Sequence, residues 1–465
     1  MFTVSLAWGC LWCTGQAFGD ELVCDSNLPG SGVTSVSIKG TTVRFELSNP
    51  NFFMLRLKGC KGKTVVFQTP GTKQWVSLRP LYTYEMDFQN PLHLNCGLGA
   101  SFYLPQETPA AWKHVDKSAW DKKKGFEFQV AFEKDEAIVA SRVPYLPEYL
   151  ESFVLSVRSH GRLEMHRLMY TAGGRSLYLL KTLRPEGEPA TRRPTVLMYA
   201  REHANEHDGS WVVQGAMEWM LSDDPNAARI AREMNILLMP VMDPDGAAAG
   251  AFDRITDSFW PAEKVESPEA RKIAEWLKWN WIDAGEEIDL VIDLHSVQSG
   301  EGPALFVPRG DPRREKEISG FNKLMQARVA PGDMDTRFHS EGNSPFRLVG
   351  YCQDAYGSVP LCYEVNSQSP KKKLTVAEMG GLGKAFLETA EQYFYSMDGM
   401  KTRAGVKTHL EKRAEILAAG GNIPGVSNNP GSNPMLIELS AQAPKANHSE
   451  SRPADGRDTS QPAIK

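Results

Sequence analysis

Outside its first nineteen residues, the sequence lacks any apolar run long enough to span a membrane. A membrane-crossing helix needs about 20 mostly apolar residues, so no membrane span is expected. The sequence also lacks an excess of either charge, because 52 basic and 57 acidic residues leave a formal net charge of −5 over 465 residues. A nucleic-acid-binding surface needs clustered positive charge, so no nucleic-acid partner is expected either.

Cysteine is scarce, with seven in the whole chain, and no zinc-finger spacing is present. Two of the seven, Cys10 and Cys13, fall within the first nineteen residues. The remaining five are Cys24, Cys60, Cys96, Cys352 and Cys362. Because five is an odd number, one or two disulfides are possible, and the cysteines by themselves indicate no function.

The first nineteen residues have the character of a removable signal peptide. Residues 2–18 are mostly apolar, and Ala17-Phe18-Gly19 before Asp20 has the small-x-small form of a signal-peptidase site. No Lys or Arg precedes the apolar run, so a buried N-terminal strand is the alternative. We expect residues 1–19 to be a signal peptide and the mature protein to be secreted or periplasmic. Without a signal it would be cytoplasmic.

Residues 20–147 are predicted to form an antiparallel β-sandwich. Val43, Phe45 and Leu47 alternate with polar neighbours, and so do the apolar residues between 126 and 132. This alternation is typical of strands with one buried face, and Asn, Pro and Gly clusters between the strands indicate turns.

From residue 148 to about residue 400, strands alternate with helices. Residues 195–200, 236–242 and 288–294 are short apolar runs, and Ser267-Pro268-Glu269 has the capping residue, proline and acidic first turn of a helix start. This order predicts an α/β domain in which helices flank a mainly parallel or mixed sheet.

The last segment, residues 401–465, is expected to be a C-terminal helix followed by a disordered tail. Beyond Gly420 the sequence consists largely of Asn, Pro, Gly, Ser and Ala, with few aromatic residues. Such a composition buries too little apolar surface to offset the entropy of ordering.

A candidate metal site follows the run 195–200. His203 and Glu206 lie three apart, so one tight turn can direct both side chains to a single point. His295 follows the run 288–294 and is placed to be a third ligand, because the carboxyl ends of parallel strands form one edge. A catalytic zinc ion takes three such protein ligands and leaves a fourth position for water.

Two acidic residues complete the candidate site. Glu364 follows the apolar run 359–363, where its carboxylate could act as a general base. Asp245, in Asp243-Pro244-Asp245-Gly246, could accept a hydrogen bond from a ligating histidine and fix its tautomer. A plain turn role for Asp245 is the alternative.

With these residues in place, residues 41–395 resemble the zinc carboxypeptidases, and within them a secreted, bacterial-type member of the cytosolic carboxypeptidase branch, which has a β-sandwich before the catalytic domain. The resemblance rests on the residues above together with Ser210-Trp211, Pro240 and Pro144-Tyr145. It implies that the residues matching His203, Glu206 and His295 bind one Zn²⁺ per chain. It also implies that the residue matching Glu364 is the catalytic base.

The chain departs from the family where an Asn-Arg pair would anchor the substrate's carboxylate. The corresponding loop reads Arg254-Ile255-Thr256-Asp257-Ser258-Phe259-Trp260. If Asp253-Arg254 is the aligned pair, Arg254 is the remaining arginine, and it could either stabilise the oxyanion or hold a carboxylate.

The segment before Glu364 contains residues that could replace the missing Asn-Arg pair. Arg347, Tyr356, Arg337 and His339 lie there, and an arginine suits a carboxylate because it can donate two parallel hydrogen bonds. Arg347 and Tyr356 are the predicted substrate-binding residues.

The sequence therefore predicts a zinc-dependent metallocarboxypeptidase that acts on a peptide or protein substrate. One alternative is a zinc amidohydrolase or deacylase of the same fold, acting on an acyl-amino acid or a cell-wall peptide. An alternative of another class is a non-catalytic binding protein. The oligomeric state and the preferred C-terminal residue stay open.

Overall fold

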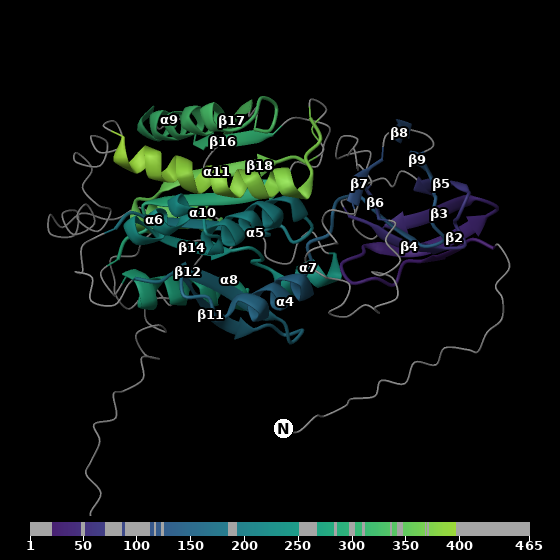
Figure 1. Ribbon diagram of the computed structural model, residues 1–465, viewed down its shortest axis with the longest axis horizontal. Coiled ribbons are helices and arrows are strands. Elements are labelled where there is room, and N and C mark those ends of the chain that lie inside the picture. Colours follow the sequence, from purple (N-terminus) through teal and green to yellow (C-terminus); the bar gives the residue numbers. More distant parts are fainter. Residues whose placement is uncertain are drawn as a thin grey trace, which may run out of the picture.

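The protein is represented by a computed structural model with two parts (Figure 1). A β-rich front part holds the strands β1 to β10, between Val23 and Ala140, and a larger α/β part holds the elements α4 to α11, between Pro147 and Tyr395. Residues 1–20 and 397–465, which include the predicted signal peptide and tail, lie outside the described residues. The described residues are 21–47, 52–69, 86–88, 112–115, 118–121, 125–184, 193–250, 267–282, 286–296, 303–308, 312–334, 337–341, 347–367, 369 and 372–396.

Two five-stranded sheets make up the front part. The first has the order β1 (Val23–Asp25), β4 (Met54–Lys58), β10 (Ala137–Ala140), β6 (Met86–Phe88) and β7 (Trp112–His114). The second has the order β2 (Val33–Lys39), β3 (Thr42–Leu47), β5 (Thr64–Thr69), β9 (Gly125–Ala131) and β8 (Ser118–Asp121). All neighbours are antiparallel except β3 and β5, which run parallel.

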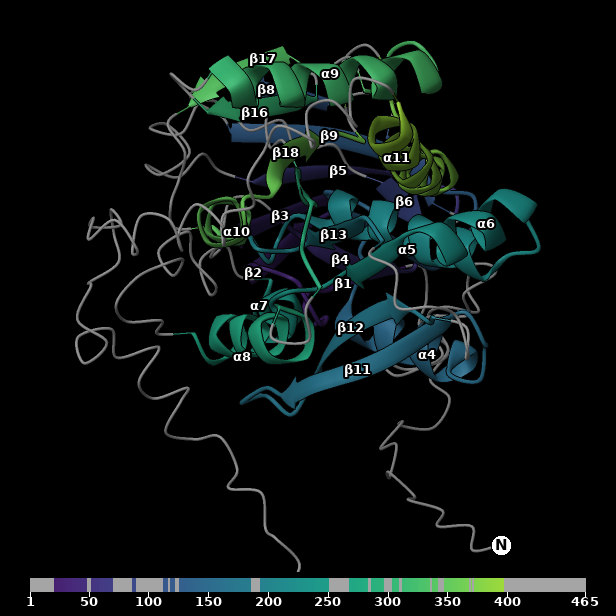
Figure 2. The ribbon, with the colours of Figure 1, turned by 90° about the vertical axis from the view of Figure 1, so that its left-hand side faces the viewer.

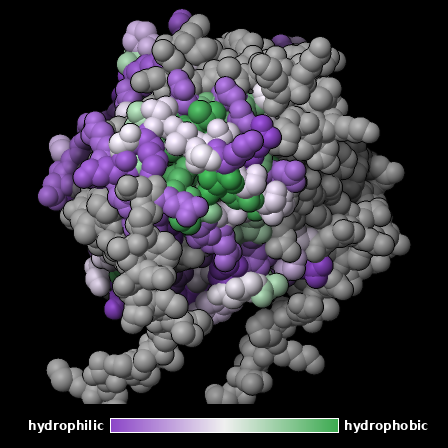
Figure 3. Space-filling view, turned by 90° about the vertical axis from the view of Figure 1, so that its right-hand side faces the viewer, coloured by the Kyte–Doolittle hydropathy of each residue, from purple (hydrophilic) through white to green (hydrophobic). Residues whose placement is uncertain are grey.

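Alternation along the strands builds the core between the two front sheets. Phe45 and Phe67 point inward and are almost fully buried, and the ring of Phe45 lies 4.8 Å from that of Phe53 next to the first sheet. The intervening Arg44 and Gln68 point outward, where the Arg44 guanidinium donates to the Gln68 side chain at 2.9 Å. At this end of the molecule, hydrophobic residues near the middle of the face are surrounded by hydrophilic ones (Figure 3).

One mixed eight-stranded sheet organises the rest of the chain. The central strands β14, β13, β15 and β18 are parallel to one another, and antiparallel strands join them on both sides. The order is β11 (Leu163–Tyr170), β12 (Ser176–Thr182), β14 (Asn235–Met239), β13 (Thr195–Ala200), β15 (Leu290–Ser296), β18 (Val359–Val365), β16 (Ala304–Pro308) and β17 (Arg337–Glu341).

Helices cover both faces of this sheet (Figure 2). One face packs against α4 (Pro147–Val157), α5 (His207–Leu221), α6 (Pro225–Glu233), α9 (Pro312–Arg328) and α11 (Val376–Tyr395). The other packs against α8 (Pro268–Leu277), the π-helical turn η2 (Lys278–Ile282) and α10 (Leu348–Tyr356). The adjacent residues Val291 and Ile292 of β15 enter different cores, as expected for a sheet buried on both sides.

Local sequence signals account for several helix starts. The Ser267 hydroxyl caps α8 by accepting from the Ala270 amide at 3.2 Å, as predicted. The short helix α7 (Pro244–Ala249) is capped by Asp243, whose carboxylate accepts from the Gly246 amide at 2.7 Å. Among the described helices, none has the length and apolar character needed to cross a membrane.

The front part contacts the start of α5 directly. The buried ring of Phe52 stacks on the ring of His207 with centroids 4.1 Å apart. The amide of Tyr145, which lies between β10 and α4, donates to Nδ1 of His207 at 2.8 Å. The segment that leads into α5 is therefore packed against residues from both parts of the chain.

Candidate metal centre

The loop between β13 and α5 turns sharply and presents two of the predicted ligands. Arg201 adopts φ +67°, a left-handed conformation that residues other than glycine rarely take. Its fully buried guanidinium donates to the carbonyl of Tyr145 at 2.9 Å. After this turn the amide of Glu206 donates to the carbonyl of His203 at 3.2 Å, and α5 begins at His207. Glu206 and His203 therefore extend from one compact turn at the carboxyl end of β13.

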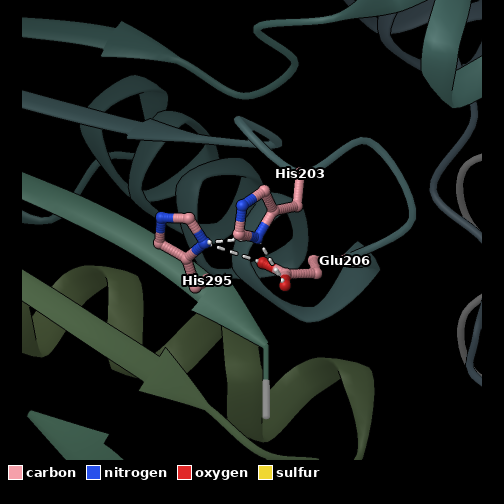
Figure 4. Close-up of side chains that lie close together, drawn as sticks. All are labelled: His203, Glu206 and His295. Carbon is pink, nitrogen blue, oxygen red and sulfur yellow. Dashed lines mark hydrogen bonds and ion pairs between the residues drawn. The ribbon is translucent and has the colours of Figure 1, made fainter. Parts of the chain in front are cut away.

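His203, Glu206 and His295 converge on one point (Figure 4). Nδ1 of His203 lies 2.9 Å from Oε1 of Glu206, and Nδ1 of His295 lies 2.9 Å from Oε2 of the same carboxylate. The two Nδ1 atoms are 3.2 Å apart. The structure thus brings together the three residues that the sequence predicts as ligands, from the β13 loop and the end of β15.

The donor set fits a divalent cation. Nε2 of His295 lies 3.0 Å from Oδ2 of the buried Asp293, and a carboxylate there accepts the ring N–H. In that tautomer Nδ1 of His295 carries a lone pair, which faces two further electron-pair donors. Four-coordinate zinc with bonds of about 2.0–2.1 Å holds its ligand atoms about 3.3 Å apart, close to the separations seen here. These three residues would hold the ion.

The charges around the site favour a cation as well. Burial alone would raise the pKa of Glu206, but His203 and His295 outweigh it and hold that pKa below its usual value. Burial alone would lower the pKa of His295, but Asp293 and Glu206 raise it well above its usual value. Buried negative charge therefore surrounds the ring that would bind the metal.

A second cluster, Asp293, His295 and Cys362, shares a histidine with the first and suits a metal less well. The Nε2 atom of His295 is already taken by Asp293. Metals bind cysteine as the thiolate, yet burial and Asp293 raise the pKa of the Cys362 thiol well above its usual value. We therefore assign the candidate metal to the first cluster.

Glu364 lies beside this cluster. In the parallel pairing of β15 and β18, Glu364 is directly opposite His295. Its Oε2 atom is buried and has no hydrogen-bond partner within the described part of the chain. Burial and the nearby Glu206 raise the pKa of Glu364 to about 7. A carboxylate with a raised pKa and an uncommitted oxygen is suited to move a proton near neutral pH.

Asp245 lies elsewhere, which corrects the expectation that it orients a ligating histidine. Its Oδ1 accepts from the Thr171 hydroxyl at 2.7 Å and from Arg175 at 3.1 Å, and its Oδ2 accepts from the Gly173 amide at 2.7 Å. Asp245 therefore ties the start of α7 to the turn between β11 and β12. The acceptor beside His295 is Asp293, which the sequence reasoning missed. The pair Asp293 and His295 was detectable, because residues two apart on a strand share a face.

The predicted substrate-binding residues are not brought together. Arg347 immediately precedes α10, where its Nη1 lies 3.6 Å from Sγ of Cys362. Tyr356 is at the other end of this nine-residue helix, and its hydroxyl is 3.2 Å from that of Tyr351. A nine-residue helix is about 13 Å long, so the backbones of Arg347 and Tyr356 lie at opposite ends of α10.

Two further candidates for binding the substrate's carboxylate lie on β17, and Arg254 lies outside the described residues. Arg337 and His339 belong to the outermost strand of the sheet, which pairs with β16 rather than with β18. Arg254 falls in 251–266, outside the described residues, so its predicted role stays a prediction.

The fold resembles that of solved metallo-carboxypeptidases. A metallo-carboxypeptidase from Burkholderia cenocepacia superposes with a TM-score of 0.65 at 19% identity, covering 80% of this chain and 98% of that one. A metallo-carboxypeptidase from Pseudomonas aeruginosa was solved in complex with (2-guanidinoethylmercapto)succinic acid. It superposes with a TM-score of 0.62 at 17% identity, covering 79% of this chain and 97% of that one. At these identities the likeness establishes the fold.

The sequence comparison matches a family model to part of the α/β region, including His203 and Glu206. Residues 154–264 match the family model for zinc carboxypeptidase. Cytosolic carboxypeptidase 2 from Macaca fascicularis is 28% identical over 130 residues, which are 27% of this chain and 16% of the relative. Cytosolic carboxypeptidase 3 from Bos taurus is 24% identical over 207 residues, which are 40% of this chain and 20% of the relative. The match thus spans a fifth or less of these relatives' length.

Proposed function

We propose that the protein is a zinc-dependent metallocarboxypeptidase that removes C-terminal residues from peptides. The observation that carries this proposal is the convergence of His203, Glu206 and His295 on one point with Glu364 beside them. The family domain covers the first two of these residues, and the fold is that of metallo-carboxypeptidases. A zinc ion when bound acidifies water and polarises the carbonyl of the scissile bond.

The protein's own residues would supply proton transfer and orientation. Glu364 takes a proton from water as the water attacks the carbonyl carbon of the scissile amide. The same carboxyl then gives the proton to the leaving nitrogen, so the residue ends each turnover ionised. Asp293 keeps the His295 ring in one tautomer, with its lone pair turned toward the ligand cluster.

We propose that Arg347 recognises the free carboxylate of the substrate. Its side chain is half-buried, and its guanidinium reaches Cys362, two residues before Glu364 on the same face of β18. A guanidinium on this face lies next to the proposed general base, where the last residue of a peptide would have to sit. It can also donate two parallel hydrogen bonds to one carboxylate.

Replacing Glu364 tests the function as a whole. The variant Glu364→Gln keeps the shape and should keep one zinc ion per chain, while hydrolysis of N-blocked dipeptides falls by about 10³-fold or more, since a positioned general base contributes about 10²–10⁴-fold. Metal analysis and initial rates are the measurements, and Glu315→Gln on the exposed side of α9 is the control. A zinc-loaded Glu364→Gln variant that turns over at the wild-type rate would contradict the assignment.

The same assay separates the alternative functions. A carboxypeptidase hydrolyses a peptide with a free C-terminus and leaves its C-terminally amidated form intact. An amidohydrolase or deacylase of this fold accepts an acyl-amino acid or cell-wall peptide instead. A binding protein would hold zinc and hydrolyse neither.

We propose in addition that the protein is exported after removal of residues 1–19. The proposal rests on the apolar segment and the Ala17-Phe18-Gly19 sequence before Asp20. N-terminal sequencing of the protein purified from its natural host should begin at Asp20. A protein that still begins at Met1 in the cytoplasm would contradict export.

A further inference from the structure

The first two amide groups of helix α10 donate hydrogen bonds to two side chains near the candidate metal ligands. The residue that precedes it, Arg347, makes no capping hydrogen bond with its own side chain. Instead, Oε1 of Glu202 accepts from the Leu348 amide at 3.2 Å, and the Tyr199 hydroxyl accepts from the Val349 amide at 3.0 Å. Tyr199 and Glu202 come from the end of β13 and the turn that holds His203. The first amide groups of α10 are therefore bound by residues next to a proposed metal ligand.

The carboxylate of Glu202 is buried and hydrogen-bonded at the start of α10. Glu202 is fully buried, and its Oε2 lies 3.4 Å from the Tyr199 hydroxyl and 3.9 Å from Nε2 of His295. A buried carboxylate is costly unless it is hydrogen-bonded or close to positive charge. The amino end of a helix supplies both, because its free N–H groups and the helix dipole favour a negative group there.

The start of α10 also determines where Arg347 can reach. Arg347 is extended, with φ −95° and ψ 156°, and it is bonded directly to Leu348, whose amide donates to Glu202. From this point its guanidinium reaches Sγ of Cys362. Cys362 and Glu364 lie two apart on β18 and so share the face that carries Asp293 and His295. A shift of the helix start would move the guanidinium relative to Glu364.

We propose that Glu202 and Tyr199 are positioning residues that hold Arg347 in place to bind the substrate's carboxylate. This inference rests on the proposed function, in which Arg347 is the group that recognises the carboxylate. It adds that the turn carrying His203 also sets the position of the substrate anchor. The metal ligands and the anchor are then parts of one rigid unit, linked by the hydrogen bonds at the amino end of α10.

Two substitutions at Glu202 distinguish its role as a hydrogen-bond acceptor from the effect of its side-chain size. Glu202→Met keeps the size but removes the acceptor, and should raise KM for N-blocked dipeptides at least tenfold with kcat and zinc content within threefold of the wild type. Glu202→Gln keeps an acceptor for the Leu348 amide and should restore KM to within threefold. Tyr199→Phe should raise KM in the same direction, and it provides the test if Glu202→Met does not fold. Unchanged KM in both Glu202→Met and Tyr199→Phe overturns the proposal.

A double variant shows whether Glu202 acts through Arg347. The variant Arg347→Gln should itself raise KM at least tenfold. Adding Glu202→Met to it should then cause no further rise, because the group that Glu202 positions is already gone. Independent, multiplying effects on KM would mean that Glu202 acts by another route, and the proposal would be wrong.

Binding of a product-like ligand distinguishes this inference from the proposed function. Calorimetry with N-acetylphenylalanine and zinc-loaded protein measures carboxylate binding without turnover. If the wild type hydrolyses no peptide, the proposed function fails. The positioning role then stands if Glu202→Met weakens this binding at least tenfold and has no effect in the Arg347→Gln background. Binding of equal strength in wild type and Glu202→Met refutes the positioning role, whatever the activity.

Discussion

At the scale of single residues, the site depends on which atom of each side chain faces the centre. His295 has two ring nitrogens, and both are occupied in different ways: Nε2 meets Asp293 and Nδ1 meets Glu206. The hydrogen bond to Asp293 makes Nδ1 the atom available to a metal. A residue that never touches the metal thus decides whether His295 can bind it.

Replacing Asp293 should weaken the metal site without unfolding it. In Asp293→Asn the ring loses its charged partner, so its basicity and orientation suffer, and zinc affinity should fall about 10–100-fold. Competition with a chelator measures this loss. Asp289→Asn is the matched control, because Asp289 caps the amino end of the sheet, where its carboxylate accepts from the Thr195 amide at 2.8 Å. Wild-type zinc affinity in Asp293→Asn would exclude the role given to this carboxylate.

Asp245 should affect stability rather than metal binding. Asp245→Asn removes the charge that binds Thr171, Gly173 and Arg175, so the free energy of unfolding at pH 7 should fall by about 1.5–3 kcal/mol. Zinc content should stay at the wild-type level. Denaturant unfolding and metal analysis are the measurements, and a loss of zinc would restore the earlier expectation that Asp245 supports a ligand.

The difference in stability between wild type and Asp245→Asn depends on pH, because the charge of Asp245 depends on its pKa. Burial opposes ionisation, but the hydrogen bonds from Thr171, Gly173 and Arg175 outweigh it and lower the pKa. A carboxyl with a lowered folded pKa stabilises the protein above its unfolded pKa of about 3.9, and this stabilisation is lost as pH falls through the folded value. Wild type and Asp245→Asn should therefore converge in stability only below about pH 4.

At the scale of elements, the packing of α5 against α11 sets the position of the helix that follows Glu206. Helix α5, which begins directly after Glu206, lies against α11, and both carry glycines where they meet. A Cβ added at Gly215 would come within 3.0 Å of backbone atoms of Gly380. The glycines therefore allow the two backbones to approach closely, which sets the position of α5 relative to the sheet.

Adding one methyl group at this contact should separate the helices. Gly215→Ala should lower the free energy of unfolding by about 1–3 kcal/mol, because the crowding involves backbone atoms that cannot rotate away. Gly381→Ala is the control on the exposed side of α11, where a Cβ meets nothing within 4 Å. It should be neutral or stabilising by up to about 1 kcal/mol, since alanine favours helix. Equal stability of the two variants would show that the contact tolerates the methyl group.

At the scale of the whole molecule, the front part and the α/β part meet next to the metal-binding turn. Phe52 belongs to the core of the α/β part through its contact with His207, whereas its neighbour Phe53 belongs to the core of the front sheets. The buried pair of Arg142 and Asp208 lies in the same region, and Asp208 also accepts from the Ser367 amide at 2.8 Å. The front part is thus in contact with the residues that follow Glu206.

Truncating each phenylalanine in turn should separate these two roles. Phe52→Ala and Phe53→Ala should each cost about 3–5 kcal/mol of stability, as for other buried phenylalanines. Only Phe52→Ala should also lower the zinc affinity of the folded protein, because it removes the ring that supports His207 beside Glu206. Chelator competition below the unfolding transition tests this. Matching zinc affinities in the two variants would show that the front part does not support the metal turn.

Much of this arrangement could be predicted from the sequence, because its signals are local. Alternation at Val43, Phe45 and Leu47 gave a strand, and Ser267-Pro268 gave a helix start, since both depend only on neighbouring residues. His203, Glu206 and His295 could be grouped because parallel strands end at one edge of the sheet. Each of these predictions needs the type of element and its direction, but not its packing partner.

The sequence by itself therefore determined the β-rich first part, the alternation of strands and helices after it, and the residue types that follow three of the strands. Only the tertiary structure decided that Asp293 rather than Asp245 accepts from His295, that β3 and β5 run parallel, and that Arg347 and Tyr356 lie at opposite ends of α10. The physical reason is that a hydrogen bond between distant segments depends on register and on the rotation of each element about its axis. Periodicity along the chain carries no information about either across such distances.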